Sequence, residues 1–375
     1  MFIFVSKIIK KAQGMHQKKI CLIGNNLSNG GADKIHAILS NYFFSQAIDV
    51  HNIILIDCVT YEFSGKLLNL GKLENKNSVL ANIEKFLKLK RFLKQNKFDF
   101  IIDFRMRNNQ FKEFIISKFL YKSPFIITVH SYKTEWYFPK NNFLAKNIFS
   151  KAYGILAVSK EIETKIVEKY HYQNVKTIHN PLEIEKIESL SSEENNIDFQ
   201  YIIAVGRMVF DNNKQFDKLI EAYSKSDLPK QNIKLVLLGD GPQRIILEQL
   251  ALTKNIQDKV VFLGFQGNPF KYLAKAKFFV LTSKNEGLPN SITESLACGI
   301  PVVSFDCKSG PRELIEDRRN GLLVENQNFE KLTSAMNEMI KNTELHRYCK
   351  GNAKESIQRF AVENIGKQWM NYLKI

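Results

Sequence analysis

Long apolar runs are missing from this chain of 375 residues. No stretch approaches the ~20 consecutive apolar residues that a membrane-spanning helix needs, which excludes a polytopic membrane protein. The five cysteines are odd in number, widely spaced and without any Cys-x-x-Cys pair, which excludes a disulfide framework and a zinc ribbon. Because unpaired cysteines are typical of a reducing compartment, we expect a cytoplasmic protein.

Repeats of a fixed short period and low-complexity tracts are also missing, so solenoids and propellers are excluded. Hydrophobic residues make up 44% of the chain and charged residues 25%, which is the mixture of an ordinary globular protein. At ~150 residues per domain, the length favours two domains. Each of them is large enough to bury a substantial core.

Short apolar runs alternate with helical patterns in both halves of the chain, which indicates parallel sheets covered by helices. The expected strands are residues 20–23, 53–56, 98–104, 125–129 and 154–158 in the first set, and residues 201–205, 234–238, 260–263, 278–281 and 301–305 in the second. Between the two sets, residues 183–196 are acidic, polar and weakly periodic, as a linker is. The predicted fold class is therefore α/β, with two doubly wound Rossmann-like domains at residues 16–181 and 198–357 and a linker at 182–197.

Residues 1–15 form an N-terminal extension with a short apolar start that lysines interrupt. It has no long apolar core and no small-residue cleavage site, so we do not expect export. The extension is either a short basic amphipathic anchor or a stretch upstream of a true start at Met15, and we favour the second interpretation.

Positive charge is concentrated in the first half. Residues 1–180 hold 28 Lys and Arg against 13 Asp and Glu, whereas the remainder holds 26 against 25. Residues 80–97 predict a helix with leucines and phenylalanines on one side and lysines on the other. This pattern fits contact with an anionic membrane surface or a lipid diphosphate, and a solvated lysine-rich face is the plain alternative. Nucleic acid is disfavoured, because helix-turn-helix, zinc-finger and RNP-like patterns are missing.

Ligands of doubly wound sheets bind beyond the carboxyl ends of the strands, so the residues that follow each apolar run are the candidates for a site. Gly30 and Gly31 follow the first expected strand and open a helix whose amides could receive a phosphate or a sugar hydroxyl, although an ordinary glycine turn is the plain alternative. His130 ends the fourth expected strand, Arg207 follows the sixth and Glu286 follows the ninth. Their common position favours a binding site.

The second half supplies groups that suit a nucleotide sugar. We expect Arg207 and Lys214, on the loop that opens the second domain, to be free of carboxylate partners and to hold a diphosphate. Glu286 and Glu294 flank a turn in which Pro289 suits the first turn of a helix. Helix amides can hold phosphate while the acidic groups accept hydrogen bonds from sugar or ribose hydroxyls, so one short element can bind both parts of a nucleotide sugar.

Taken together, these motifs resemble the glycosyltransferases of family 4, the retaining GT-B enzymes of bacterial surface-glycan synthesis, over nearly the whole chain. The matching motifs are Asn29-Gly30-Gly31-Ala32, His130, Ala157-Val158-Ser159, Asn180-Pro181, Val205-Gly206-Arg207, Leu238-Gly239-Asp240-Gly241-Pro242, Phe262-Leu263-Gly264, residues 286–294, Ala297-Cys298-Gly299-Ile300-Pro301-Val302-Val303 and Gly310-Pro311-Arg312-Glu313. The specific part is the Glu-x7-Glu stretch followed by Ala-Cys-Gly-Ile-Pro-Val-Val. The glycine pairs alone would be a weak signal.

The resemblance implies a role for each candidate residue. Arg207 and Lys214 would hold the donor diphosphate as catalytic cations. Glu286 would lie beside the sugar hydroxyls, Glu294 would bind the ribose, and His130 would lie near the transferred sugar. The remaining predicted substrate contacts are the backbone amides of Gly287, Leu288, Asn290 and Ser291 on the donor side, and the Gly30 and Gly31 turn.

The resemblance also implies a cleft between the two domains, with the nucleotide sugar bound mainly by the second domain and the acceptor by the first. A C-terminal helix, at about residues 358–375, would return to the first domain. The anomeric configuration would be retained through front-face attack, in which the departing phosphate helps to take the acceptor proton. No protein nucleophile is then required, since preorganised cations stabilise the growing charge of the leaving group.

Two departures from the family pattern stand out. Arg207 and Lys214 are seven residues apart, which is wider than usual, because residues 209–213 add length to the loop. Asp33 stands where many members have Glu. Two absences also bear on cofactors: no Asp-x-Asp pair occurs, so we expect no metal, and no Gly-x-Gly-x-x-Gly motif supports a dinucleotide cofactor.

The sequence therefore predicts a retaining glycosyltransferase that moves a hexose or N-acetylhexosamine from a UDP-sugar to a lipid-linked or growing surface glycan. The expected partners are the nucleotide sugar, the acceptor and an anionic membrane on its cytoplasmic face, with no nucleic acid and no cofactor. A GT-B epimerase or phosphorylase is the nearest alternative. A bilobed sugar-binding protein is a further one, although it would need an export signal.

Overall fold

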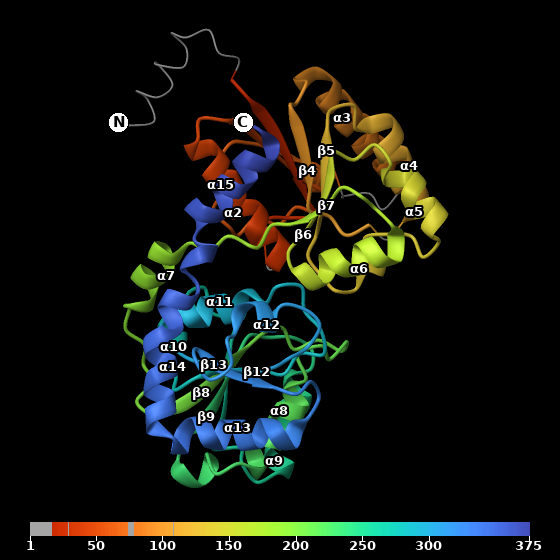
Figure 1. The fold of residues 1–375 in the computed structure, drawn as a ribbon. Coiled ribbons are helices and arrows are strands. Elements are labelled where there is room, and N and C mark those ends of the chain that lie inside the picture. The colour runs from red at the N-terminus through yellow and green to blue at the C-terminus, as the bar shows by residue number, and fades with distance from the viewer. Residues whose placement is uncertain (1–16, 29, 74–78, 108) are drawn as a thin grey trace. The chain divides into compact units, whose positions relative to one another are not determined.

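The computed structural model describes residues 17–28, 30–73, 79–107 and 109–375. The chain forms two compact units, one from the residues up to Pro181 together with Val362–Ile375, and the other from Leu182–Ala361 (Figure 1). The N-terminal extension at residues 1–15, for which we considered an anchor and an upstream start, lies outside the described residues. None of the described helices has both the length and the apolar composition needed to cross a membrane.

The first unit is built on a parallel sheet in the order β3-β2-β1-β4-β5-β6-β7. Its strands are β1 (Lys19–Gly24), β2 (Asp49–Ile54), β3 (Lys66–Asn69), β4 (Phe100–Asp103), β5 (Phe125–Val129), β6 (Gly154–Ala157) and β7 (Val175–Thr177). The five expected strands are confirmed, with shifted ends at β2 and β4. Strands β3 and β7 were not predicted, because these edge strands are short and only partly buried and so contain no apolar run.

Helices cover both faces of this sheet. They are α2 (Gly31–Ser45), α3 (Val79–Asn96), α4 (Gln110–Ile115) with a π-helical turn η2 (Ile116–Leu120), α5 (Asn142–Phe149), α6 (Lys160–Tyr170) and α15 (Val362–Leu373). Because crossover connections are right-handed, the strand order places α3, α4, α5 and α6 on one face and α2 on the other. The returning helix α15 packs beside α2 (Figure 1). The ring centroids of Phe43 and Trp369 lie 6.2 Å apart between these helices.

The second unit repeats this plan with the strand order β10-β9-β8-β11-β12-β13. Its strands are β8 (Tyr201–Val205), β9 (Lys234–Leu238), β10 (Val260–Gly264), β11 (Phe279–Leu281), β12 (Val302–Phe305) and β13 (Gly321–Val324), and its helices are α7 (Ile184–Ser191), α8 (Phe216–Lys225), α9 (Arg244–Thr253), α10 (Phe270–Leu273), α11 (Asn290–Ala297), α12 (Pro311–Leu314), α13 (Phe329–Lys341) and α14 (Thr343–Ser356). The expected strands are confirmed, and β13 was missed because only three consecutive apolar residues follow Gly321. The prediction of two doubly wound α/β units is therefore correct.

The segment predicted to be a linker contains a helix instead. Helix α7 spans Ile184–Ser191, and Ile187 is only 2% exposed because α7 packs against α10 and α11 within the second unit. Ile184, Ile187 and Leu190 recur every three residues, which places them on one face of a helix. The acidic composition of the segment obscured this stripe in the sequence.

Candidate functional site

The loop that follows β8 carries Arg207 and lies against the turn that follows β9. Gly239 has φ +131°, and a Cβ placed on it would lie 2.0 Å from the carbonyl oxygen of Gly206, so only glycine fits this approach. The amide of Met208 donates to the carbonyl of Asp240 at 2.9 Å. Arg207 is exposed at this edge, and within the described part of the second unit its guanidinium has no hydrogen-bond or ion-pair partner.

Lys214 and Glu286 form an ion pair, with 2.7 Å between Nζ and Oε1 and with side chains that are 24% and 15% exposed. The expectation that Lys214 has no carboxylate partner is therefore wrong. Glu286 lies 72 residues further along the chain, so no local pattern could indicate the pair. An ammonium group has three N–H donors, so Lys214 can hold Glu286 and still donate to a phosphate oxygen.

The longer loop does not carry Lys214 away from the Arg207 loop. The Lys214 side chain packs against Gly206, with its Cγ 3.0 Å from where a Cβ would stand on that glycine. The Lys214 carbonyl accepts from Thr282 Oγ1 at 2.6 Å, and Asn213 Nδ2 donates to the carbonyl of Asn285 at 2.8 Å. The end of β11 thus fixes the loop, and its extra residues project outward, where Phe210 is 68% exposed.

The predicted donor-binding stretch lies between β11 and α11. The amide of Glu286 donates to the carbonyl of Lys308 at 2.8 Å, and Ser309 Oγ donates to the carbonyl of Gly287 at 2.8 Å. No side chain caps the start of α11, where Asn290 and Ser291 are the first residues, and Leu288 is buried just before it. The structure differs from the prediction in one detail: Pro289 is the N-cap of the helix and does not lie in its first turn. Glu294 is partly exposed one turn further on.

The glycine turn of the first unit opens α2 as predicted, with Gly30 as the N-cap and Gly31 as the first helical residue. No side chain caps this helix start. A Cβ on Gly30 would lie 2.2 Å from Asp33 Oδ2, so the Asp33 carboxylate folds back over the turn. A carboxylate repels phosphate and accepts from hydroxyls, so this turn suits a sugar hydroxyl better than a phosphate.

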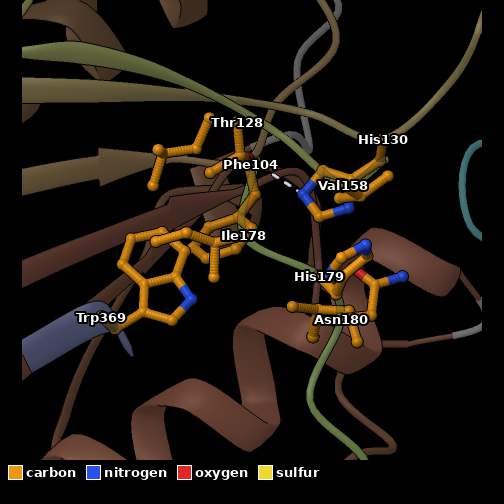
Figure 2. A pocket seen from close by; sticks show the side chains of 10 residues that line it. Phe104, Thr128, His130, Val158, Ile178, His179, Asn180 and Trp369 are labelled. Atoms are coloured by element: carbon orange, nitrogen blue, oxygen red, sulfur yellow. Dashed lines mark hydrogen bonds between the residues drawn. The ribbon is translucent and has the colours of Figure 1, made fainter. Parts of the chain in front are cut away.

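His130 follows β5 and lines a narrow pocket in the first unit with Thr128, Val158, His179, Asn180 and Trp369 among its walls. Figure 2 shows His130, His179 and Asn180 at one side of this pocket and the Trp369 indole at the other. His130 Nε2 lies 3.0 Å from Thr128 Oγ1, and that hydroxyl donates to the carbonyl of Asp103 at 3.1 Å.

These contacts fix the tautomer of His130. Because the Thr128 hydroxyl uses its hydrogen on Asp103, it must accept from Nε2–H of His130, which leaves Nδ1 as an acceptor without a partner among the described residues. Burial, and then the charge of Arg107, lower the pKa of His130 to about 3. His130 is therefore neutral near pH 7, and its buried Nδ1 is a hydrogen-bond acceptor.

A buried ionic network behind this pocket was not found from the sequence. Arg105 Nη2 lies 2.7 Å from Asp103 Oδ2 and 3.1 Å from Glu113 Oε2, and Arg107 Nη2 donates to the carbonyl of Asp103 at 2.7 Å. Burial alone would raise the pKa of Asp103, but the charges of Arg105 and Arg107 lower it to about 2. The signal was the Asp-x-Arg-x-Arg run at residues 103–107, which begins where β4 ends at the carboxyl edge of the sheet.

Acidification is expected to destabilise the first unit through His36. The Nε2–H of this buried ring donates to Asn52 Oδ1 at 3.0 Å, and burial lowers the pKa of His36 to about 4. A histidine whose folded pKa lies below the unfolded value of ~6.5 supports the fold fully above pH ~6.5 and loses that support as the pH falls toward 4. Between pH 7 and pH 5, wild type should lose about 2 kcal/mol more than His36→Gln in urea unfolding. Equal losses would show that His36 is not the group responsible.

Across the ranges that the structure describes, no group of three or more His, Cys, Asp or Glu side chains is arranged to hold a metal ion. The five cysteines are free thiols. Burial raises the pKa of the Cys307 thiol, which lies near Lys214 and Glu286, so it is a neutral thiol at physiological pH.

Solved structures of other proteins share this fold. Two solved structures share the fold at 16% and 20% sequence identity: Staphylococcus aureus TarM with fondaparinux, α-GlcNAc-glycerol and UDP (TM-score 0.76, covering 96% of this chain and 100% of that one), and Anabaena HepE with UDP (TM-score 0.74, covering 95% and 99%).

Sequence comparison is more specific. Residues 186–356 match the family described as "Glycosyl transferases group 1". The chain is 30% identical over 371 residues to the Campylobacter jejuni N-acetylgalactosamine-N,N'-diacetylbacillosaminyl-diphospho-undecaprenol 4-alpha-N-acetylgalactosaminyltransferase, and this similarity covers 95% of this chain and 99% of that protein. Similarity over nearly the full length of both chains shows that this protein belongs to the group 1 glycosyltransferases and is a glycosyltransferase with the two Rossmann-like units of the GT-B fold.

Proposed function

We propose that this chain is a retaining glycosyltransferase of family 4 that moves a hexose or N-acetylhexosamine from a UDP-sugar to a lipid-linked or growing surface glycan. The observation that carries the proposal is the ion pair of Lys214 and Glu286, which lies beside the Arg207 loop and precedes the uncapped start of α11. TarM and HepE were solved with UDP, and the C. jejuni relative is named for a diphospho-undecaprenol-linked substrate. These names support a UDP-linked donor and a lipid-linked acceptor.

The second unit binds the donor in this proposal. Arg207 contributes an exposed guanidinium, and Lys214 contributes an ammonium that Glu286 already holds in place. As the bond between the anomeric carbon and the diphosphate oxygen breaks, negative charge grows on that oxygen, and both cations stabilise it without reorganisation. Glu286 accepts hydrogen bonds from the sugar hydroxyls, Glu294 accepts from the ribose hydroxyls, and the amides of Gly287, Leu288, Asn290 and Ser291 bind sugar and phosphate.

The first unit binds the acceptor. Its turn at Gly30 and Gly31 offers the Asp33 carboxylate to a sugar hydroxyl, and His130 offers the Nδ1 lone pair. The acceptor oxygen bonds to the anomeric carbon on the face from which the diphosphate departs, and the acceptor proton passes to the departing phosphate oxygen. Configuration is thereby retained. Neutral His130 positions a hydroxyl rather than removing its proton, because its pKa of about 3 makes it a weak base.

A lipid-linked acceptor would place the reaction at a membrane, and we propose the cytoplasmic face, where nucleotide sugars and free thiols are both stable. The excess of Lys and Arg over Asp and Glu in residues 1–180 supports contact with anionic headgroups.

The reaction can be tested directly by measuring UDP release from UDP-sugars with and without membrane extracts that contain acceptors. If the enzyme transfers the sugar, UDP release depends on the acceptor. If it retains configuration, NMR of the product shows the same α or β configuration at the anomeric carbon as in the donor. Release of a sugar phosphate, or conversion of the donor without an acceptor, would overturn the proposal in favour of a phosphorylase or an epimerase.

Glu294→Ala is expected to raise the Kd for UDP by roughly 10- to 100-fold, because a hydrogen bond to a charged group is worth ~1.5–3 kcal/mol. Glu286→Ala should leave the UDP affinity within about threefold of wild type, since it removes a sugar contact and frees Lys214 for phosphate. Isothermal titration with UDP compares the two variants. If both bind UDP equally well, the assignment of Glu294 to the ribose is wrong.

A further inference from the structure

Three consecutive crossover segments of the first unit expose large apolar side chains. Phe111 of α4 and Phe143 of α5 are each 75% exposed, and Phe119 of η2 is 59% exposed. On α3, Leu87 is 55% exposed and Ile83 is 49% exposed. Large exposed apolar groups that gather on one surface mark an interaction site rather than ordinary surface variation.

These segments lie side by side on one face of the sheet. Burial is the main cause that lowers the pKa of Lys112 on α4, and the charge of Lys85 on α3 contributes to the same shift. The two helices therefore lie close together. The π-helical turn meets α5, because Lys118 Nζ donates to Ser150 Oγ at 2.9 Å. Figure 1 shows α3, α4 and α5 along the same side of the first sheet.

This surface, which we call the α3–α5 face, is strongly basic. Residues 79–151 contain 15 Lys and Arg against five Asp and Glu, and all of the basic residues except Arg105 and Arg107 are at least partly exposed. Two of the five acids, Asp103 and Glu113, are buried around Arg105, and Asp99 pairs with Lys18 at 3.2 Å. Most of the acidic charge is therefore used inside the unit, while lysines such as Lys88, Lys90 and Lys94 are exposed between the apolar groups.

We propose that the α3–α5 face docks this protein on an anionic lipid bilayer, with Phe111, Phe119 and Phe143 entering the interfacial region and the lysines contacting the headgroups. Interfacial binding needs both features on one surface, because buried apolar area and attraction to anionic lipid add together. The proposal rests on the proposed function in one respect, since a lipid-linked acceptor gives the enzyme a reason to be at the membrane.

A second apolar surface of the chain shows why the charge matters. Helix α9 of the second unit exposes Ile245, Ile246 and Leu252 by 53–66%, yet Arg244 there pairs with Glu248 at 2.8 Å. Arg244 and Glu248 are the only charged residues of α9, so this helix carries no net charge, and residues 181–375 as a whole hold 26 Lys and Arg against 25 Asp and Glu. Helix α9 therefore provides a matched control.

The test compares two triple variants of the full chain, Phe111→Ser, Phe119→Ser, Phe143→Ser on the α3–α5 face and Ile245→Ser, Ile246→Ser, Leu252→Ser on α9. Each is sedimented with vesicles of phosphatidylcholine containing phosphatidylglycerol. The first variant should lose at least tenfold in partitioning and the control less than twofold, and wild-type binding should fall with added salt and with phosphatidylcholine alone. Equal binding by both variants, or wild-type binding that ignores salt and anionic lipid, overturns the proposal.

Further readouts separate this surface from the catalytic site and from other partners. UDP should raise the melting temperature of both variants and of wild type by the same amount. This result would show that the variants are folded, and it does not depend on transfer activity. If vesicle binding is lost in the α3–α5 variant while transfer to a water-soluble acceptor persists, the surface acts in docking alone. If vesicles bind normally but no donor is consumed, the proposed function fails and the docking surface stands. Tighter binding of wild type to a single-stranded oligonucleotide than to vesicles would contradict a lipid partner.

Discussion

Replacing Lys214 with methionine is expected to lower kcat by about 100-fold, the effect of removing one preorganised group that stabilises transition-state charge. The methionine stem preserves packing against Gly206, so the loss of the cation dominates. Glu286, 15% exposed in the wild type, also loses its partner and would repel the departing diphosphate. Because the interaction strengthens as the leaving group departs, kcat should fall more than KM rises.

Steady-state kinetics with saturating UDP-sugar checks this expectation, and Lys218→Met is the matched control. Lys218 lies on α8 four residues further on, is 46% exposed and pairs only with Glu221 among the ion pairs of the described chain. It should leave kcat within about twofold, as exposed ion pairs contribute little. Arg207→Gln should lower kcat by roughly one to two decades. A Lys214→Met enzyme with wild-type kcat would remove Lys214 from the catalytic set.

The strand pattern of both units was readable from the sequence because central parallel strands are buried on both sides and form continuous apolar runs. Edge strands such as β3 and β7 are partly exposed and left no such run. Helix α7 was mistaken for a linker because its apolar stripe is narrow and the remaining residues are acidic. The acidic composition of this segment therefore indicated a linker, whereas the three-residue spacing of its apolar residues would have predicted the helix.

The candidate residues follow strand ends, as the sequence predicts, but the contacts between their side chains were not predicted. Rules about carboxyl ends of parallel strands place Arg207, His130 and Glu286 at the edges of their sheets. They cannot say which long side chains meet, and the contact of Lys214 with Glu286 joins residues 72 positions apart. The tautomer of His130 likewise depends on Thr128 and Asp103, on two neighbouring strands whose adjacency only the strand order provides.

The buried network of the first unit gives the largest expected effect on stability. Asp103→Asn should destabilise the protein by about 3–5 kcal/mol, because it leaves Arg105 and Arg107 buried without their shared carboxylate. Both arginines are only 4% exposed, so water cannot replace the lost partner without local opening. Urea unfolding at pH 7 measures this difference.

Two comparisons decide whether this loss comes from orphaned charge. Asp99→Asn breaks the pair with Lys18, whose side chain is 46% exposed, and should change stability by no more than about 1 kcal/mol. Adding Arg107→Met to Asp103→Asn removes one orphaned cation and should recover part of the stability, whereas a lost packing contact would not be recovered by a second truncation.

The folded pKa of Asp103, about 2, lies below its ordinary value, so wild type should keep this contribution from neutral pH down to about pH 4 and lose it progressively toward pH 2. An Asp103→Asn protein as stable as wild type at pH 7 would mean that the two arginines find other partners and that the network does not hold the unit together.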